Sequence, residues 1–478
     1  MDKVKVRFAP SPTGPLHIGG ARSALFNYLY ARNQQGVLLL RIEDTDLERS
    51  KPEYEREIVE SLSWLGMTWD EGIDVGGANG PYRQTERLDT YQRYSDALLR
   101  SGQAYHCFCT EEELEEERNQ LIEKGDTPRY LGKCRSLTSE ERDEKLKKGI
   151  MPTVRFKVPE GRSWVVNDIV RDRVSFESET MGDFIIVKSD GIPTYNFAVV
   201  IDDHEMGVTH VVRAEEHLSN TPRQLMIYEA LGFGLPEFAH ISLILGADRQ
   251  KMSKRHGATS VVQYREKGYL PEALFNFLAL LGWSPEGEQV IMDCDEITKQ
   301  FGLDRVAKNP AIFDLDKLNW INAQYIKRKK FDELGELLQP FFAKSSYIDR
   351  VKALDPETFQ VLIEAIRERL VCLSDVVTEI EPFFAEPEYD VEAREVLQTS
   401  ETQDMLRRVA QMLPEKFDID TGHAFMKQLP KGLELPPKKV YMPLRIALTG
   451  LGKGPDLPYL LTVMGPQEIR RRIASVVS

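Results

Sequence analysis

Two short segments of the chain carry residue types that handle phosphate groups, and the first is Pro15-Leu16-His17-Ile18-Gly19-Gly20. Glycines at positions 19 and 20 let a ligand approach the backbone. A helix that begins here offers free N–H groups and the positive end of its dipole, and His17 adds a side-chain donor at the same end. A glycine-rich turn with a surface histidine has the same pattern, because short motifs often match by chance.

The second segment is Lys251-Met252-Ser253-Lys254-Arg255, on a loop just past the last expected strand. Two lysines three positions apart and an arginine form a mobile cationic loop. Such charges stabilise phosphoryl oxygens while a nucleophile displaces pyrophosphate. A solvated basic turn is the more frequent explanation for one such segment alone. The two segments together favour the chemical interpretation.

The elements around the first segment predict a strand, a helix and a second strand. Val4–Phe8 is a short apolar-rich run that enters a loop stiffened by three prolines, and helical spacing begins at Gly19. Val37–Leu40 then indicates a buried strand. This is a βαβ unit, and Arg41–Asp46 lies just past its second strand, where open α/β sheets present ligand-binding side chains.

Beyond this unit, the pattern predicts an insertion and then a return to the sheet. Helices are expected at Glu53–Leu65 and Glu86–Arg100, and Thr138 with Glu141 forms a capping box. Residues 96–189 are interpreted as a mixed α/β insert with strands at Thr153–Val158 and Phe184–Val187. Further strands are predicted at Tyr195–Ile201, Val208–Arg213 and Ile241–Leu245, with a helix at Ser219–Leu231. After Leu270 the apolar spacing is helical.

The charge balance excludes a globally basic nucleic-acid binder, because 62 Lys and Arg stand against 76 Asp and Glu, a net charge of −14. Local basic patches still permit a nucleic-acid partner. Three basic clusters in the helical half are candidate RNA contacts, with solvated helix faces as the alternative: Lys327-Arg328-Lys329-Lys330, Lys438-Lys439 and Arg470-Arg471-Arg472.

The length of 478 residues suggests three or four domains. No stretch approaches the roughly 20 apolar residues of a membrane helix, and the first residues lack the apolar run of a signal peptide. Five cysteines at irregular spacing favour a reducing compartment over a disulfide framework. We therefore expect a soluble, cytoplasmic protein without a membrane partner.

His17-Ile18-Gly19-Gly20 resembles the HIGH signature, and Lys251–Arg255 the KMSKS signature, of class I aminoacyl-tRNA synthetases. Gly20 replaces the second histidine of the generic signature. Further segments make the whole chain similar to the bacterial glutamyl-tRNA synthetases: Ala9–Gly14, Arg41–Asp46, Pro193–Phe197 and Thr209–His217.

This resemblance implies a two-step ligase. L-glutamate attacks the α-phosphate of ATP, which arrives with Mg²⁺, and tRNA(Glu) then captures the glutamyl group from the adenylate. Neither step needs an enzyme nucleophile. In agreement with this, the spacing of residues in the sequence supports no Ser/His/Asp or Cys/His catalytic triad. The resemblance assigns catalysis to His17, Lys251 and Lys254, and ATP binding to His17, Gly19, Gly20 and Lys254. A monomer is the expected state.

The family binds its amino acid with residues that match Arg7, Ala9, Ser11, Glu43, Tyr195 and Arg213. Arginine can hold a carboxylate through two parallel hydrogen bonds, and glutamate can pair with an ammonium group. Ordinary surface ion pairs are the alternative for each residue taken singly.

Cys107, Cys109 and Cys134 are similar to the zinc ligands of some family members. Those members place a histidine two residues after the third cysteine, but here that residue is Ser136. The fourth zinc ligand would be Tyr130 or water. Reduced, buried thiols without metal are the alternative.

The expected fold class is α/β: a Rossmann-like catalytic domain with an α/β insert, followed by a mostly α-helical C-terminal half. The expected domains are the catalytic domain at 1–95 and 190–250, an acceptor-end-binding insert at 96–189, a stem-contact domain at 251–325 and a helical anticodon-binding part at 326–478.

Four related classes compete with a glutamyl-tRNA synthetase. Glutaminyl-tRNA synthetases carry β-barrel anticodon domains, whereas residues after about 326 have helical patterns. Short tRNA-modifying paralogues and small nucleotidyltransferases lack the second half, and a non-catalytic relative would not need both signatures. A glutaminyl-tRNA synthetase, or a non-discriminating enzyme that also charges tRNA(Gln) with glutamate, is the remaining alternative.

Overall fold

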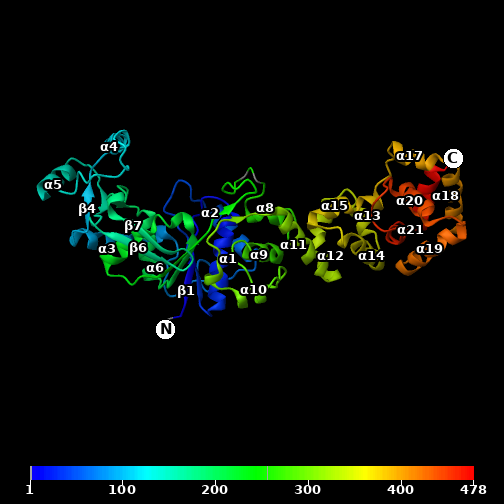
Figure 1. The fold of residues 1–478 in the computed structure, drawn as a ribbon, viewed down its shortest axis with the longest axis horizontal. Helices are drawn as coiled ribbons and strands as arrows, with labels where there is room; N and C mark the ends of the chain where they lie inside the picture. Colours follow the sequence, from blue (N-terminus) through cyan, green and yellow to red (C-terminus); the bar gives the residue numbers. More distant parts are fainter. Residues whose placement is uncertain (1–2, 254, 256, 478) are drawn as a thin grey trace. The chain divides into compact units, whose positions relative to one another are not determined.

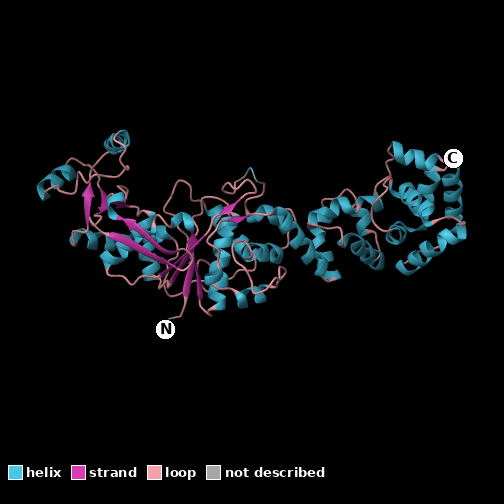
Figure 2. Cartoon of the chain, viewed as in Figure 1, coloured by secondary structure: helices cyan, strands magenta, loops and turns pink. Residues whose placement is uncertain are grey.

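The computed structural model describes residues 3–253, 255 and 257–477, and the chain divides into two compact units (Figure 1). Unit 1 comprises the described residues of Met1–Arg265 and Leu274–Asp314. Unit 2 comprises those of Glu266–Ala273 and Leu315–Ser478. All strands among the described residues lie in unit 1, while unit 2 is helical (Figure 2). The predicted α/β catalytic part with a helical C-terminal half is confirmed.

A seven-stranded sheet forms the centre of unit 1, in the order β3-β2-β1-β9-β10-β6-β7. Every neighbouring pair is parallel except β6 and β7. The order reverses between β1 and β9, and in such doubly wound sheets ligands bind at this point, outside the carboxyl ends of the strands. The strands are β1 (Lys5–Phe8), β2 (Val37–Leu40), β3 (Glu71–Gly72), β6 (Ser163–Asp168), β7 (Asp172–Glu177), β9 (His210–Ala214) and β10 (Glu237–Ile241).

Helices connect these strands much as the sequence predicts. The predicted βαβ unit is confirmed, because α1 follows the proline loop and leads into β2. The helices are α1 (Ile18–Asn33), α2 (Pro52–Trp64), α3 (Leu88–Arg100), α6 (Tyr195–Glu205), α7 (Thr221–Leu231), α8 (Val261–Glu266), α9 (Pro271–Ala279) and α10 (Cys294–Gln300).

The predicted strand at Tyr195–Ile201 is wrong, because these residues begin helix α6. Residues Phe197–Ile201 are buried without a break, so the segment has no polar face that would reveal a helical period. A short apolar run of this kind does not distinguish a buried strand from a buried helix. The helix continues to Asp202 and Asp203, which are also buried.

The predicted strand at Ile241–Leu245 is also wrong in its bounds. Strand β10 starts earlier, at Glu237, and ends at Ile241. The chain then leaves the main sheet, and β11 (Ile244–Leu245) pairs with β12 (Ala311–Ile312) in a separate two-stranded sheet.

The predicted insert contributes to two sheets. One is an antiparallel sheet of three strands: β4 (Ala104–Cys107), β5 (Thr153–Phe156) and β8 (Phe184–Val187). Between β4 and β5, the chain forms the helices α4 (Glu111–Glu123) and α5 (Ser139–Lys147). The predicted capping box at Thr138 and Glu141 starts α5. In contrast, β6 and β7 extend the main sheet through β10. The insert is therefore continuous with the catalytic sheet.

Unit 2 contains a short segment from earlier in the chain. The backbone of Gly268 accepts a hydrogen bond from Leu373 N, and Leu270 N donates to Asn322 Oδ1 at 2.8 Å. Gly268 has a φ of +80°, and a Cβ atom there would lie 2.7 Å from Ser374 N. This close approach requires glycine.

The remaining helices of unit 2 follow one another through the rest of the chain. They are α11 (Leu315–Arg328), α12 (Phe331–Phe342), α13 (Ile348–Lys352), α14 (Pro356–Arg367), α15 (Val376–Glu379), α16 (Glu381–Phe384), α17 (Val391–Gln398), α18 (Ser400–Met412), α19 (Ile419–Leu433), α20 (Pro437–Thr449) and α21 (Leu457–Val476). Among the described residues, no helix has both the length and the apolar character needed to cross a membrane.

Candidate active site

A cavity of about 730 Å³ opens at the carboxyl ends of β1 and β9. It brings together all the predicted amino-acid and phosphate residues that the structure describes: Arg7, Ala9, Ser11, His17, Gly19, Gly20, Glu43, Tyr195, Arg213 and Lys251. Lys254 and His256 of the cationic loop lie outside the described residues. The cavity therefore occupies the point where the strand order reverses.

His17 is the N-cap of helix α1. Its Nδ1 accepts a hydrogen bond from Gly19 N at 3.2 Å. A neutral imidazole carries one proton, so Nε2 is the donor nitrogen. Desolvation by the surrounding walls lowers the pKa of His17, Lys251 lowers it further, and Glu216 opposes both. His17 is thus a neutral donor at the positive end of a helix, which suits a phosphate oxygen.

Arg7 and Glu43 belong to a buried network of ion pairs. Arg7 Nε lies 3.1 Å from Asp203 Oδ1, and Arg41 Nη1 lies 2.9 Å from the same oxygen. Arg41 Nη2 donates to Glu43 Oε1 at 3.0 Å. Arg41 is fully buried among three carboxylates, since Asp202 lies 3.6 Å from its Nε. The network fixes the positions of Arg7 and Glu43.

The pKa shifts in this network follow from burial and pairing. Burial raises the pKa of Glu43, and the neighbouring arginines only partly offset it. For Asp203, burial also acts upward, but Arg7 and Arg41 outweigh it and hold the pKa of this carboxyl below its usual range. Asp203 is therefore the firmly ionised partner of Arg7.

Asp202 anchors the opposite side of the network. Its carboxylate accepts from Arg87 Nε at 2.7 Å, from Tyr91 Oη at 2.9 Å and from Gln84 Nε2 at 2.9 Å. Sequence reasoning placed Arg41 just past the second strand without giving it a role, and it missed Asp202 and Asp203. The sequence signal that could have indicated Asp202 and Asp203 is that two acidic residues directly follow the apolar run Phe197–Ile201.

Arg213 has different surroundings from Arg7. Its Nη1 donates to Tyr195 Oη at 3.2 Å, and its Nη2 donates to Gln224 Oε1 at 2.7 Å. Its remaining partners, Thr221 and His240, are also uncharged acceptors. Among the described residues, no carboxylate forms an ion pair with Arg213. The cavity therefore presents a buried positive charge that suits an anionic ligand.

Lys251 forms an ion pair with Glu216, a residue that also lines the cavity. Both side chains are about half exposed. Exposed pairs contribute roughly 0–1 kcal/mol, so a phosphate group can displace Glu216 at little cost. Arg255 pairs with Asp248 at 3.2 Å on the same loop.

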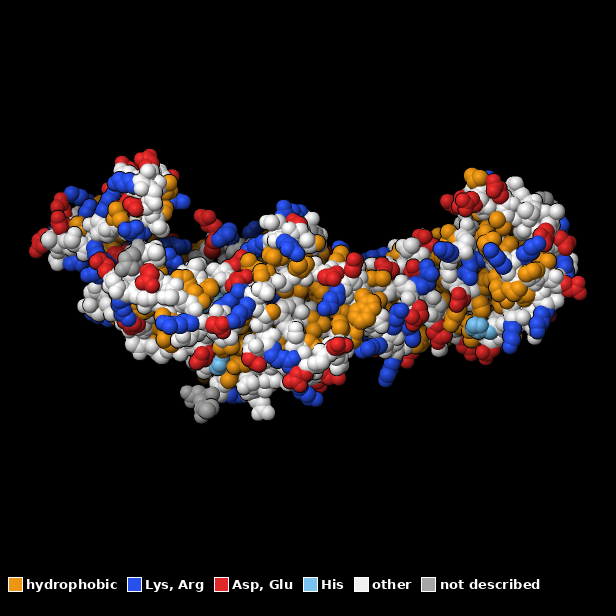
Figure 3. Space-filling model, viewed as in Figure 1, with side chains coloured by type: hydrophobic (Ala, Val, Ile, Leu, Met, Phe, Trp, Pro, Cys, Tyr) orange, Lys and Arg blue, Asp and Glu red, His pale blue; other side chains and the backbone are white. Residues whose placement is uncertain are grey.

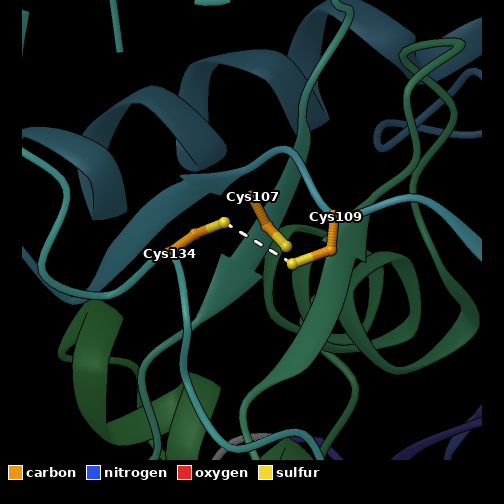
Figure 4. Close-up of side chains that lie close together, drawn as sticks. All are labelled: Cys107, Cys109 and Cys134. Atoms are coloured by element: carbon orange, nitrogen blue, oxygen red, sulfur yellow. Dashed lines mark hydrogen bonds between the residues drawn. The ribbon is translucent and has the colours of Figure 1, made fainter. Parts of the chain in front are cut away.

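The three predicted zinc cysteines converge in the insert, as Figure 4 shows. Their sulfur atoms all lie within 4.8 Å of one another. Cys109 Sγ lies 3.6 Å from Cys134 Sγ, and Tyr130 Oη lies 3.5 Å from the sulfurs of both Cys107 and Cys109. Ligand atoms about 2.3 Å from a tetrahedral zinc ion lie about 3.8 Å apart, so the four residues fit this metal.

The basic clusters of unit 2 are largely occupied by partners within the unit. Arg472 is fully buried and donates to Glu468 and to the carbonyl oxygens of Leu448 and Phe383, so the prediction of an RNA contact is wrong for this residue. Arg471 and Lys439 pair with glutamates. On the face in Figure 3, basic and acidic side chains are interspersed.

Comparison with known proteins adds independent information. A family model described as class I tRNA synthetases (E and Q), catalytic domain, matches residues 3–320, and an anticodon binding domain model matches residues 333–477. Glutamate–tRNA ligase of Carboxydothermus hydrogenoformans is 61% identical over 477 residues, 99% of each chain. Glutamate–tRNA ligase 1 of Caldicellulosiruptor saccharolyticus is 52% identical, over 98% of each chain.

A solved structure of similar shape is the crystal structure of a glutamate tRNA ligase from Elizabethkingia meningosepticum in complex with its amino acid. It has a TM-score of 0.91 and 38% sequence identity, and the match covers 99% of each chain.

Proposed function

Because the chain belongs to the class I tRNA synthetases of the glutamate and glutamine group, we propose that its cavity is the site of glutamate activation and transfer. The protein is a glutamate–tRNA ligase. An oxygen of the glutamate α-carboxylate attacks the α-phosphorus of ATP, and pyrophosphate leaves. A ribose hydroxyl of the terminal adenosine of tRNA then attacks the carbonyl carbon, and AMP leaves.

The observation that carries this assignment is the pair of unlike arginines in one cavity with Glu43. The partners of Arg213 within the described part of the chain are uncharged, whereas Arg7 pairs with Asp203 through Nε, so its Nη nitrogens can meet a ligand. The two positive charges suit the two carboxylates of glutamate, and Glu43 suits its ammonium group. Ala9, Ser11 and Tyr195 complete this end of the cavity.

The other end of the cavity takes ATP. His17 donates from Nε2, and Gly19 and Gly20 leave the backbone of the helix N-terminus open to a phosphate. Lys251 and Lys254 stabilise the charge that develops as pyrophosphate leaves. Mg²⁺ accompanies ATP, held mainly through phosphate oxygens and water.

Zinc in the insert is supported by the sulfur and oxygen distances described above. Cys107, Cys109, Cys134 and Tyr130 would hold the ion. With four protein ligands the site is closed, so zinc would stabilise the insert and take no part in the reaction. The insert would then present a firm surface to the acceptor end of tRNA.

A monomer in the cytoplasm is the proposed state of the enzyme. Every residue assigned above to glutamate or ATP that the structure describes lines this one cavity, which supports activity as a single chain. All five cysteines are free thiols, which suits a reducing compartment.

The assay that tests this function is transfer of labelled glutamate to purified tRNA(Glu) in the presence of ATP and Mg²⁺. We expect glutamyl-tRNA, AMP and pyrophosphate in equal amounts, with glutamine a poor substrate. Charging of tRNA(Gln) with glutamate, run in parallel, identifies a non-discriminating enzyme. Preferential charging of tRNA(Gln) with glutamine would overturn the assignment.

A further inference from the structure

A chain of buried side chains leads from the insert to the glutamate end of the cavity. It starts at Asp168, the last residue of β6, and passes through His240 of β10 to Arg213 of β9. His240 Nδ1 lies 2.5 Å from Asp168 Oδ2, and Arg213 Nε donates to His240 Nε2 at 3.1 Å. All three residues are buried, and the assignment of glutamate binding uses neither Asp168 nor His240.

Asp168 is held so that it only accepts hydrogen bonds. Its Oδ1 accepts from the backbone nitrogens of Val170 and Arg171, at 3.0 and 2.8 Å, and the backbone nitrogen of His240 also donates to it. An ionised carboxylate in this position takes the proton of His240 Nδ1 in a hydrogen bond. The neutral imidazole then has a lone pair on Nε2, which is what Arg213 Nε–H requires.

The hydrogen bonds of Arg213 show why the acceptor nitrogen of His240 affects the orientation of its guanidinium group. Nε faces His240, Nη1 donates to Tyr195 Oη at the cavity wall, and Nη2 donates to the buried Thr221 and Gln224. Loss of the acceptor at Nε2 would leave a buried N–H of the guanidinium without its partner, and the planar group could relieve this only by turning. A turned guanidinium would no longer present Nη1 to a carboxylate in the same position beside Tyr195.

We propose that Asp168 and His240 are positioning residues that orient Arg213 for a carboxylate of glutamate. The proposal rests on the assigned function of the cavity. Burial lowers the pKa of His240, although Asp168 opposes this shift, and the neutral ring agrees with the acceptor role of Nε2. The relay acts by selecting one imidazole tautomer, as a buried carboxylate beside a histidine commonly does.

Three substitutions separate orientation from a general loss of structure. Asp168→Asn keeps the shape but offers an amide N–H that favours the other tautomer, with a proton on Nε2. His240→Asn removes the acceptor for Arg213, whereas His240→Gln restores an oxygen near the position of Nε2. Asp70→Asn is the matched control, because Asp70 also accepts from a backbone nitrogen, Leu38 N, and pairs with an arginine away from the cavity.

The experiment measures steady-state charging of tRNA(Glu) and glutamate binding by calorimetry for the full-length variants. Asp168→Asn and His240→Asn should raise the glutamate KM about 10-fold or more, with the ATP KM and kcat changed less than about 3-fold. His240→Gln should recover most of the loss, and Asp70→Asn should match the wild type. In an Arg213→Ala background, Asp168→Asn should add nothing further to the glutamate KM.

Equal increases in the KM for glutamate and for ATP would overturn the proposal in favour of a structural role. A folded Asp168→Asn enzyme with unchanged glutamate KM would overturn it as well, as would a His240→Gln variant no better than His240→Asn. Circular dichroism and thermal melting establish folding. Failure of the wild-type enzyme to charge tRNA with glutamate would instead overturn the proposed function, so the two failures are distinct.

Discussion

Arg7 and Arg213 show how two identical side chains acquire different tasks from their neighbours. Arg7 shares its charge with Asp203, while Arg213 has only uncharged partners. Because Arg7 is held through Nε, its planar pair of Nη donors can meet one carboxylate. We assign Arg7 to the side-chain carboxylate of glutamate, and Arg213 to charge at the other end of the ligand.

Arg7→Lys tests this assignment. Lysine keeps the charge but loses the planar fork, so the glutamate KM should rise at least about 10-fold, the effect of losing ~1.5 kcal/mol from a charged hydrogen bond. The preference for glutamate over glutamine should narrow, because the variant no longer distinguishes a carboxylate from an amide by geometry. Steady-state kinetics with both amino acids measure this. An unchanged ratio of kcat/KM values would transfer the specificity role to Arg213 and Tyr195.

Lys254 is expected to act on the transition state more than on bound ATP. Charge on the phosphoryl oxygens grows as pyrophosphate leaves, and a nearby ammonium group stabilises these oxygens most at that moment. Lys254→Ala should lower the adenylation rate at least ~100-fold, the scale of removing one electrostatic stabiliser. Single-turnover adenylation and equilibrium ATP binding check this together. A near-normal rate would contradict the assignment.

At the level of elements, helix α6 links the stability of the fold to the site. Its Asp203 holds both Arg7 and Arg41 in a water-excluded position. Asp203→Asn leaves these guanidinium groups without their anionic partner, and breaking a buried ion pair costs about 3–5 kcal/mol. We expect a loss of this size in the free energy of unfolding, measured with urea, together with a higher glutamate KM.

Glu205→Gln, one turn from Asp202 on the same helix, is the control, because its pair with Arg93 is exposed and should be worth less than about 1 kcal/mol. The pKa of Asp203 is lowered in the folded state, so its contribution is present above the unfolded value near 4 and is lost as pH falls through the folded pKa. The difference between wild type and Asp203→Asn should therefore shrink in acid. A pH-independent difference would contradict ion pairing as the cause.

The cysteine cluster of the insert leads us to predict that the purified enzyme contains zinc. Enzyme purified without chelator should contain close to one zinc ion per chain. The double variant Cys107→Ser and Cys109→Ser should lose it and loosen the insert locally, because the site is part of the folded structure. Cys294→Ser with Cys372→Ser is the matched control and should keep the metal, since these thiols lie outside the cluster. Elemental analysis of the purified enzyme measures its zinc content. A wild-type enzyme without zinc would show that the three cysteines are buried thiols that bind no metal.

The sequence predicts some parts of the site well and others poorly, for physical reasons. Arg7 lies near the end of the short strand β1 and Glu43 comes just after β2, so their place at one sheet edge could be inferred from local patterns. Asp203 could not be placed, because residues 197–203 of α6 are all buried and the apolar run among them resembles a strand. The pairing of Asp168 with His240 joins residues 72 positions apart, which no local pattern reveals.

At the scale of the whole molecule, we propose that unit 1 carries out the chemistry and that unit 2 recognises the anticodon of tRNA. The cavity lies entirely in unit 1, and the anticodon-binding family model covers residues 333–477 of unit 2. A fragment that ends after residue 330, beyond α11, should bind glutamate by calorimetry but charge tRNA(Glu) poorly. A folded fragment that charges full-length tRNA as well as the intact enzyme does would contradict this division.

The segment Glu266–Ala273 has a consequence for exchanging parts between related enzymes. The chain passes from one unit to the other at three places, after Arg265, after Ala273 and after Asp314. A chimera joined only at Asp314 would therefore combine the unit 2 helices of one enzyme with the Gly268 loop of another, against which Leu373 and Ser374 pack without room for a Cβ atom. Recombination that respects the fold must carry these eight residues with the helical unit, so the part to be exchanged consists of two separate segments of the chain.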